Sequence, residues 1–207
     1  MMNSYQKHTP LMGLIVFNCL YIAGAVVMAM LNGNTEFVYY VSVLILLIIG
    51  AFIAHKKINY TAPLLWALSF WGLAHLAGGL LAIPENWPTD GGKRVLYSLW
   101  LIPGKLKYDQ IVHCYGFAVT TWLSWQTLAS IIHQRYKRRL QPTFGVVLLC
   151  ATSSMGYGAL NEVIEFFATL IISETNVGGY ANTSWDLVYN TIGALLAAIA
   201  ISAKQRY

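Results

Sequence analysis

Side chains that suit metal binding lie within some of the most apolar stretches of this 207-residue chain. Asp109 and His113 are four residues apart and Gly116 follows three residues later, so a helix would place all three on one face. Glu162 and Glu165 would share a helix face in the same way. Imidazole together with carboxylate suits zinc, iron or manganese rather than calcium. These residues indicate a divalent metal as the cofactor.

Further polar residues complete the candidate site. The candidate metal ligands are His75, Asp109, His113, Glu165 and Asp186. Glu162 is the candidate catalytic base, and Asn161 and Asn190 are candidate substrate-binding residues. A metal ion with an open coordination position would hold a water molecule for attack on an ester or a phosphate, and a spare carboxylate would accept its proton.

Two other interpretations of the same residues remain open. In one, Glu162 or Glu165 pairs with His113 or His75, and the pair only fixes the register of the helices. In the other, the site binds or conducts a lipid headgroup, an ion or a small solute without catalysis. The carboxylates and imidazoles then serve as hydrogen-bonding or proton-coupling groups.

Several enzyme classes are excluded by the residues present. The chain has five His, fewer than the histidine-rich set of membrane di-iron desaturases, and it lacks both a Gly-x-Ser-x-Gly elbow and a P-loop. Cys19, Cys114 and Cys150 are isolated in apolar stretches, which argues against a disulfide framework or a thiolate zinc site.

Composition identifies the surroundings of these residues as lipid. Hydrophobic residues make up 57% of the chain and charged residues 10%, whereas soluble domains average about 25% charged residues. The net charge of +5 comes from short basic clusters between apolar runs, which are typical of membrane topology signals. We therefore expect the lipid bilayer, and no nucleic acid, as a partner.

The apolar stretches are long enough to cross a bilayer, which needs roughly 20 apolar residues per helix. We expect an all-α polytopic membrane protein, a bundle of six transmembrane helices in a single domain over residues 1–207. The expected spans are residues 11–31, 37–54, 62–83, 109–132, 143–172 and 185–203. The first exceeds the roughly 7 to 15 residues of a signal-peptide core, so we interpret it as a retained helix.

Residues 84–108 form the one long loop between these spans. Within it, residues 95–102 are apolar but too short to span the membrane. This segment is either an interfacial amphipathic or re-entrant piece, with Tyr97 and Trp100 at headgroup depth, or a plain loop folded over the helix ends.

Basic residues predict that both ends of the chain lie inside. With the N-terminus inside, the inner segments hold nine Lys and Arg and the outer segments hold four, all within residues 84–108. Each expected helix 3 to 6 then carries its polar groups in the outer half of the membrane. Small residues share these faces, so we expect all four stripes to face one another in the bundle interior. The stripes are Ser69, Gly72, His75 and Gly79; Asp109, His113 and Gly116; Ser154, Gly158, Glu162, Glu165 and Thr169; and Asp186, Asn190, Gly193 and Ala197.

Four motifs follow one another along residues 70–200. They are His75-x-x-Gly78-Gly79, Tyr108-Asp109-x-x-x-His113-x-x-Gly116-Phe117, Asn161-Glu162-x-x-Glu165-Phe166 and Trp185-Asp186-x-x-x-Asn190-x-x-Gly193-Ala194. This succession resembles the YjdF-type family of bacterial inner-membrane proteins and is similar, more distantly, to the VanZ-like proteins linked to glycopeptide resistance. The resemblance implies this fold, this site and a multipass inner-membrane location, but no particular reaction. The chain departs from the pattern at Cys114, where an aromatic residue is usual, and at Phe166-Phe167, where Trp is frequent.

The leading interpretation is an intramembrane metal-dependent hydrolase or transferase that acts on a lipid or cell-envelope intermediate. The alternative is a non-catalytic membrane protein that binds or conducts a lipid, an ion or a solute.

Overall fold

The described part of the chain, residues 11–33, 35–91, 93–173, 175 and 177–204 of a computed structural model, is mainly helical. Its α-helices are α1 (Met12–Leu31), α2 (Thr35–Ile58), α3 (Ala62–Leu80), α4 (Tyr108–Tyr136), α5 (Phe144–Ile171) and α6 (Tyr180–Lys204). The mainly helical fold and the six helices expected from the sequence are confirmed.

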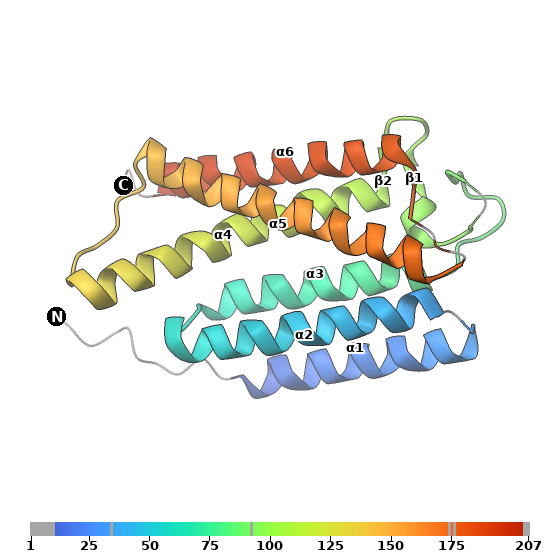
Figure 1. Cartoon of the computed structure of the whole chain (residues 1–207), viewed down its shortest axis with the longest axis horizontal. Coiled ribbons are helices and arrows are strands. Elements are labelled where there is room, and N and C mark those ends of the chain that lie inside the picture. The colour runs from blue at the N-terminus through green and yellow to red at the C-terminus, as the bar shows by residue number, and fades with distance from the viewer. Residues whose placement is uncertain (1–10, 34, 92, 174, 176, 205–207) are drawn as a thin grey trace.

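Consecutive helices run antiparallel and form two groups of three (Figure 1). α1, α2 and α3 pack on one another, and α4, α5 and α6 form the second group, in which α4 and α6 make the most extensive contact. The two groups meet chiefly where α3 packs against α4. The start of α1 and the end of α6 lie at the same end of the bundle (Figure 1).

Five of these helices, namely α1, α2, α3, α5 and α6, are long and apolar enough to cross a membrane. α4 is the exception, although it has 29 residues. It packs against α3, α5 and α6, and its buried residues include the polar side chains Gln110, Thr120 and Thr121. Because neighbouring helices cover these groups, α4 needs fewer lipid-compatible side chains than the other helices.

Small residues let neighbouring helices approach closely. Ala151 of α5 and Ala194 of α6 are fully buried against each other's helices. On the other side of the bundle, Ala25 and Ala29 of α1 pack into a cluster with Phe37 of α2. Contacts through small side chains are the usual way in which helices associate in lipid.

Residues 84–91 and 93–107, which we call the hairpin cap, fold over the helix ends where α3 finishes and α4 begins. The cap contains a 3₁₀ turn, η1 (Leu96–Ser98), and two short antiparallel strands, β1 (Trp100–Ile102) and β2 (Leu106–Lys107). Ser98 and Leu99 of the cap are buried. The segment 95–102 forms a 3₁₀ turn and a strand rather than an amphipathic helix, so the structure agrees with the loop, one of the two alternatives left open by the sequence.

The face of α3 that carries its small residues corrects one expectation from the sequence. The Ser69 hydroxyl accepts a 2.8 Å hydrogen bond from the Asn18 amide of α1. A Cβ at Gly79 would lie 1.6 Å from the ring of Phe37 in α2. These positions make room for side chains of α1 and α2, so the expectation that the stripe faces α4, α5 and α6 is wrong at Ser69 and Gly79. His75 does line a cavity with residues of those three helices.

The start of α6 differs from the sequence expectation as well. The helix begins at Tyr180 rather than near residue 185, one turn earlier. As a result Asn182, Asp186 and Asn190 occupy one helix face at intervals of four residues.

Candidate metal centre

His113 of α4 lies at the centre of the polar cluster and is buried. Its Nδ1 lies 2.9 Å from Oδ1 of Asn190 in α6. A carbonyl oxygen only accepts hydrogen bonds, so Nδ1 carries a hydrogen and donates this hydrogen bond to Asn190. In the neutral ring Nε2 is then an unprotonated ligand atom.

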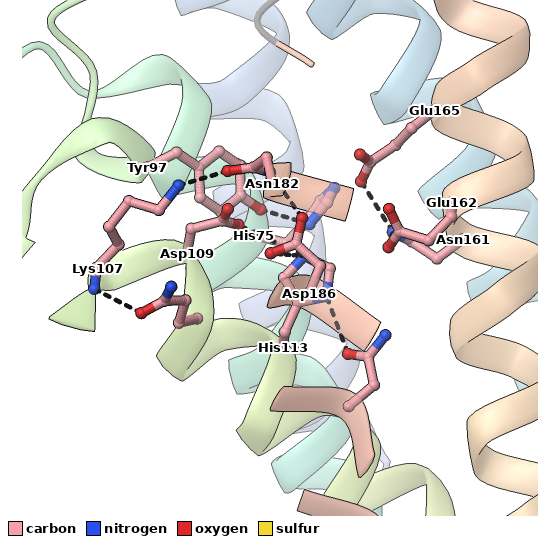
Figure 2. Close-up of polar contacts among 12 residues, drawn as sticks. His75, Tyr97, Lys107, Asp109, His113, Asn161, Glu162, Glu165, Asn182 and Asp186 are labelled. Carbon is pink, nitrogen blue, oxygen red and sulfur yellow. Dashed lines mark hydrogen bonds and ion pairs between the residues drawn. The ribbon is translucent and has the colours of Figure 1, made fainter. Parts of the chain in front are cut away.

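Two carboxylates face this nitrogen. His113 Nε2 lies 3.4 Å from Oδ1 of Asp109 and 3.9 Å from Oδ1 of Asp186 (Figure 2). A nitrogen lone pair that faces two carboxyl oxygens is unfavourable, so a proton or a cation belongs between them. A proton on the ring or on a carboxyl group, or a bound cation, would fill this role.

Two groups of side chains in the described part of the chain are compact enough to hold a metal ion, and His113 belongs to both. One group is Asp109, His113 and Asp186, and the other is His113, Glu162 and Glu165; within each, the ligand atoms lie within 4.8 Å of one another. Because Asn190 occupies Nδ1, His113 offers only Nε2. An ion bound by either group would therefore use this same nitrogen.

Both groups contain a buried oxygen atom that has no hydrogen-bond partner among the described residues. Asp186 is 1% exposed; its Oδ2 accepts a 2.7 Å hydrogen bond from Asn182, whereas Oδ1 has no hydrogen-bond partner among the described residues. Oε2 of Glu162 is likewise without one in that part of the chain. Buried carboxylate oxygens are normally satisfied, so two such atoms beside one imidazole fit a ligand that the protein does not itself supply.

The α5 side of the site is organised by Asn161. Its amide donates hydrogen bonds to Glu165, at 2.8 Å, and to Glu162, at 3.4 Å. Both carboxylates thereby point from α5 toward the position of His113 (Figure 2). In the structure, the contacts of Asn161 are with the two carboxylates, which gives it a role in positioning them.

Lys107 and Asn182 are site residues that the sequence analysis missed. Lys107 is buried at the end of the cap, with Nζ 3.2 Å from Asp90 Oδ2. It also donates to Oδ1 of Asn182, whose amide nitrogen binds Asp186. From the sequence alone, Lys107 is one of the four outer basic residues that predict the orientation of the chain. Asn182 precedes the expected start of its helix, although its spacing of four from Asp186 is a usable signal.

His75 lies on the other wall of the site and belongs to neither group of potential ligands. Its Nδ1 accepts a 2.5 Å hydrogen bond from the hydroxyl of Tyr97 in the cap. Burial raises the pKa of the Tyr97 phenol well above its usual value, which keeps the phenol protonated as a donor. The rings of Tyr40 and Trp71 flank the same imidazole.

A cavity of about 730 Å³ opens onto the centre. The cap and all helices except α1 contribute to its lining, which includes His75, Asp109, His113, Glu165 and Asp186. Glu36 of α2 and Lys93 of the cap form a 3.5 Å ion pair on its wall. A single ion needs far less space, and the volume falls in the range of small-molecule sites, about 300 to 1,000 Å³.

Glycines on α5 and α6 bring the helices of the centre together. A Cβ at Gly158 would lie 2.7 Å from the amide nitrogen of Asn190. A Cβ at Gly193 would lie 1.9 Å from the backbone oxygen of Cys114, the residue after His113. The expectation that the small-residue stripes of α4, α5 and α6 face one another is confirmed at these positions.

Residues 13–206, which include nearly all of the six helices, match the sequence model of DUF2238, a family described as predicted membrane protein. The chain belongs to the DUF2238 family. This agrees with the YjdF-type resemblance, because DUF2238 is the YjdF family. No curated protein and no solved structure matches the chain, and the more distant likeness to VanZ-like proteins is not shown. The family description names no reaction, so the chemistry of this DUF2238 protein is inferred from the geometry of its site.

Proposed function

We propose that this DUF2238 protein is a metal-dependent hydrolase or transferase of the bacterial inner membrane. It crosses the membrane six times as a single domain, with both ends inside. The centre around His113 then lies in the outer half of the membrane and binds one divalent ion, of zinc, iron or manganese. The substrate is a lipid or a cell-envelope intermediate.

The hydrogen bond from His113 to Asn190 is the observation that carries this proposal. Metal-ligating histidines almost always donate their second ring N–H to a carboxylate, carbonyl or water. Here that partner is in place, and the free nitrogen faces Asp109 and Asp186. His113, Asp109 and Asp186 fit as ligands, and Glu165 is the further ligand offered by α5.

The bound metal would polarise the substrate and lower the pKa of a water molecule. The protein residues supply the remaining functions. Glu162 has an oxygen without a hydrogen bond among the described residues and accepts the proton of the attacking water. Asn161 holds Glu162 in place. The walls of the cavity, including His75 and Tyr97, exclude bulk water and orient the substrate.

The placement of the site supports a substrate that comes from the membrane or the envelope. The later halves of α3 and α5 and the earlier halves of α4 and α6 lie toward the hairpin cap (Figure 1), and these halves carry the site residues. Most of the basic residues lie at the opposite end, which favours an outer position for the cap. The covered polar surface of α4 supports a sixth span, because protein rather than lipid surrounds it.

Elemental analysis of the purified protein tests the metal centre. We expect about one zinc, iron or manganese per chain in the wild type, and its loss in His113→Ala. His133→Ala is the matched control, because this histidine lies near the other end of the same helix, away from the centre. Wild-type protein that binds none of these metals after loading would overturn the proposal.

Turnover separates catalysis from simple binding. We expect the metal-loaded protein to hydrolyse p-nitrophenyl esters or phosphates, and Glu162→Gln to retain the metal while losing about 10²–10⁴-fold in rate, which is the usual contribution of a general base. Equal rates in wild type and Glu162→Gln would overturn the assigned base. A metal-loaded wild type without turnover of either probe would overturn catalysis in favour of a binding protein.

A further inference from the structure

A second cavity, of about 250 Å³, lies between α1 and α2 with α3 as its floor. We call it the α1–α2 groove. α1 and α2 are packed together near the cap end, where Ala25 and Ala29 contact the cluster around Phe37. The groove lies in the other half of the bundle, where Leu14 of α1 and Ala51 of α2 line it. It is separate from the His113 centre.

The lining of this groove requires no polar ligand. Most of its side chains are aliphatic or aromatic. Asn18, its central polar residue, is already satisfied: its amide donates to the Ser69 hydroxyl at 2.8 Å, and its oxygen accepts from Tyr21 at 2.6 Å. An apolar group is therefore the ligand that fits.

The length of the groove matches one leaflet. It extends along α1 from Leu11 to Ile22, which is about 16 Å at a helical rise of 1.5 Å per residue. The hydrocarbon core of a bilayer is about 30 Å thick. The groove therefore reaches from one membrane surface to about the middle, as a single acyl chain does.

Basic side chains stand at the surface end of the groove. His55, in the last turn of α2, lines it there. Lys56 follows, with its ammonium group 4.8 Å from the centre of the Phe52 ring, and Phe52 is itself part of the lining. Lys57 is in the same turn. Cations at the mouth of an apolar groove are complementary to an anionic lipid headgroup.

We propose that the α1–α2 groove binds an anionic phospholipid, with one acyl chain in the groove and the phosphate beside Lys56 and His55. The contacts are independent of the metal centre. Only the assignment of this lipid to the inner leaflet rests on the orientation proposed above.

Native mass spectrometry of delipidated protein tests the chain contact. Phosphatidylglycerol and phosphatidylcholine with identical acyl chains are the probes. We expect the wild type to retain phosphatidylglycerol, and Ala51→Trp, which fills the groove, to lose both lipids. Ile49→Trp is the matched control, because Ile49 is exposed and does not line the groove. Equal lipid binding by Ala51→Trp and Ile49→Trp would overturn the proposal.

The headgroup contact is tested by charge. A basic residue near an anionic surface contributes about fivefold in affinity, so Lys56→Gln should weaken phosphatidylglycerol binding about fivefold and leave phosphatidylcholine unchanged. Lys204→Gln, in the last turn of α6, is the control. An unchanged lipid preference in Lys56→Gln would overturn the headgroup contact. Lipid binding seen only after removal of residues 1–9 would overturn the proposal and assign the groove to the chain's own amino-terminal segment.

Discussion

At the scale of single residues, the centre is defined by which nitrogen of His113 is engaged. The amide oxygen of Asn190 fixes the tautomer, and two carboxylates from different helices face the remaining nitrogen. Replacing Asn190 and replacing Asp186 therefore have different consequences for the His113 ring. Loss of Asn190 frees the ring to turn, whereas loss of Asp186 removes a carboxyl oxygen that faces Nε2.

Tyr97 allows a prediction about pH. Burial raises the pKa of its phenol in the folded protein well above the usual value near 10. The unfolded chain ionises first, so the stabilisation is complete below about pH 10 and is lost as the pH rises above it, by up to about 1.4 kcal/mol per pH unit. In thermal unfolding from about pH 9 to 11, we expect wild type to lose stability more steeply than Tyr97→Phe.

The exposed phenol of Tyr136 at the end of α4 provides the control for this measurement. Tyr136→Phe should follow the slope of the wild type. A Tyr97→Phe protein with the same slope as the wild type would contradict the role of burial at this position.

Sequence spacing predicted those site residues that lie on regular helices. Asp109 with His113, and Asp186 with Asn190, are pairs at intervals of four, and the helix geometry alone brings each pair to one face. Helical spacing could not predict the burial of Lys107, because that burial depends on how the hairpin cap folds back over the helix ends. Periodicity carries no information about such a turn.

At the scale of elements, the contact between α4 and α6 positions the centre. Gly193 allows α6 to approach the backbone of α4 at Cys114. Sequence reasoning identified this stripe correctly but misplaced the equivalent one on α3. A stripe of small residues accommodates either a neighbouring backbone or a large side chain, and at Gly79 it is the ring of Phe37. The pattern of one helix does not distinguish these two cases.

We expect Gly193→Ala to destabilise the protein by about 1–3 kcal/mol, the usual effect of overpacking. The added Cβ would meet the backbone oxygen of Cys114 at 1.9 Å, and backbone does not move aside as a flexible side chain does. Thermal unfolding in detergent measures the change. Gly156→Ala on α5 is the control, because a Cβ at that position would meet no described neighbour within 4 Å. A Gly193→Ala protein as stable as Gly156→Ala would contradict the close approach.

At the scale of the whole molecule, the distribution of basic residues gives a direction to the bundle. Lys56 and Lys57 end α2, and Arg135 lies near the end of α4, all at the end opposite the hairpin cap. The sequence predicted the six helices, and the orientation stays a prediction. It did not predict that α4, the helix with the central histidine, is the one whose polar side chains are covered by its neighbours, because composition does not show which helix its neighbours enclose.

Reporter fusions test this orientation. A fluorescent protein that folds only in the cytoplasm should be active after Arg139 and after Arg206. A phosphatase that folds only outside should be active when inserted at Gly104, in the turn between β1 and β2. The reason is the positive charge of the inner segments, which resists translocation. A reporter after Arg206 that is active only on the outer side would refute the proposed topology.

The division of the bundle into two groups of helices separates the potential ligands from part of the cavity wall. The potential ligands Asp109, His113, Glu162, Glu165 and Asp186 all belong to α4, α5 and α6. The first group contributes only walls of the cavity, such as Tyr40 and His75. A change in the tilt of one group relative to the other would therefore reshape the space offered to a substrate without altering a single ligand distance. In the proposed enzyme, the metal ligands and the walls that select the substrate would thus be mechanically independent.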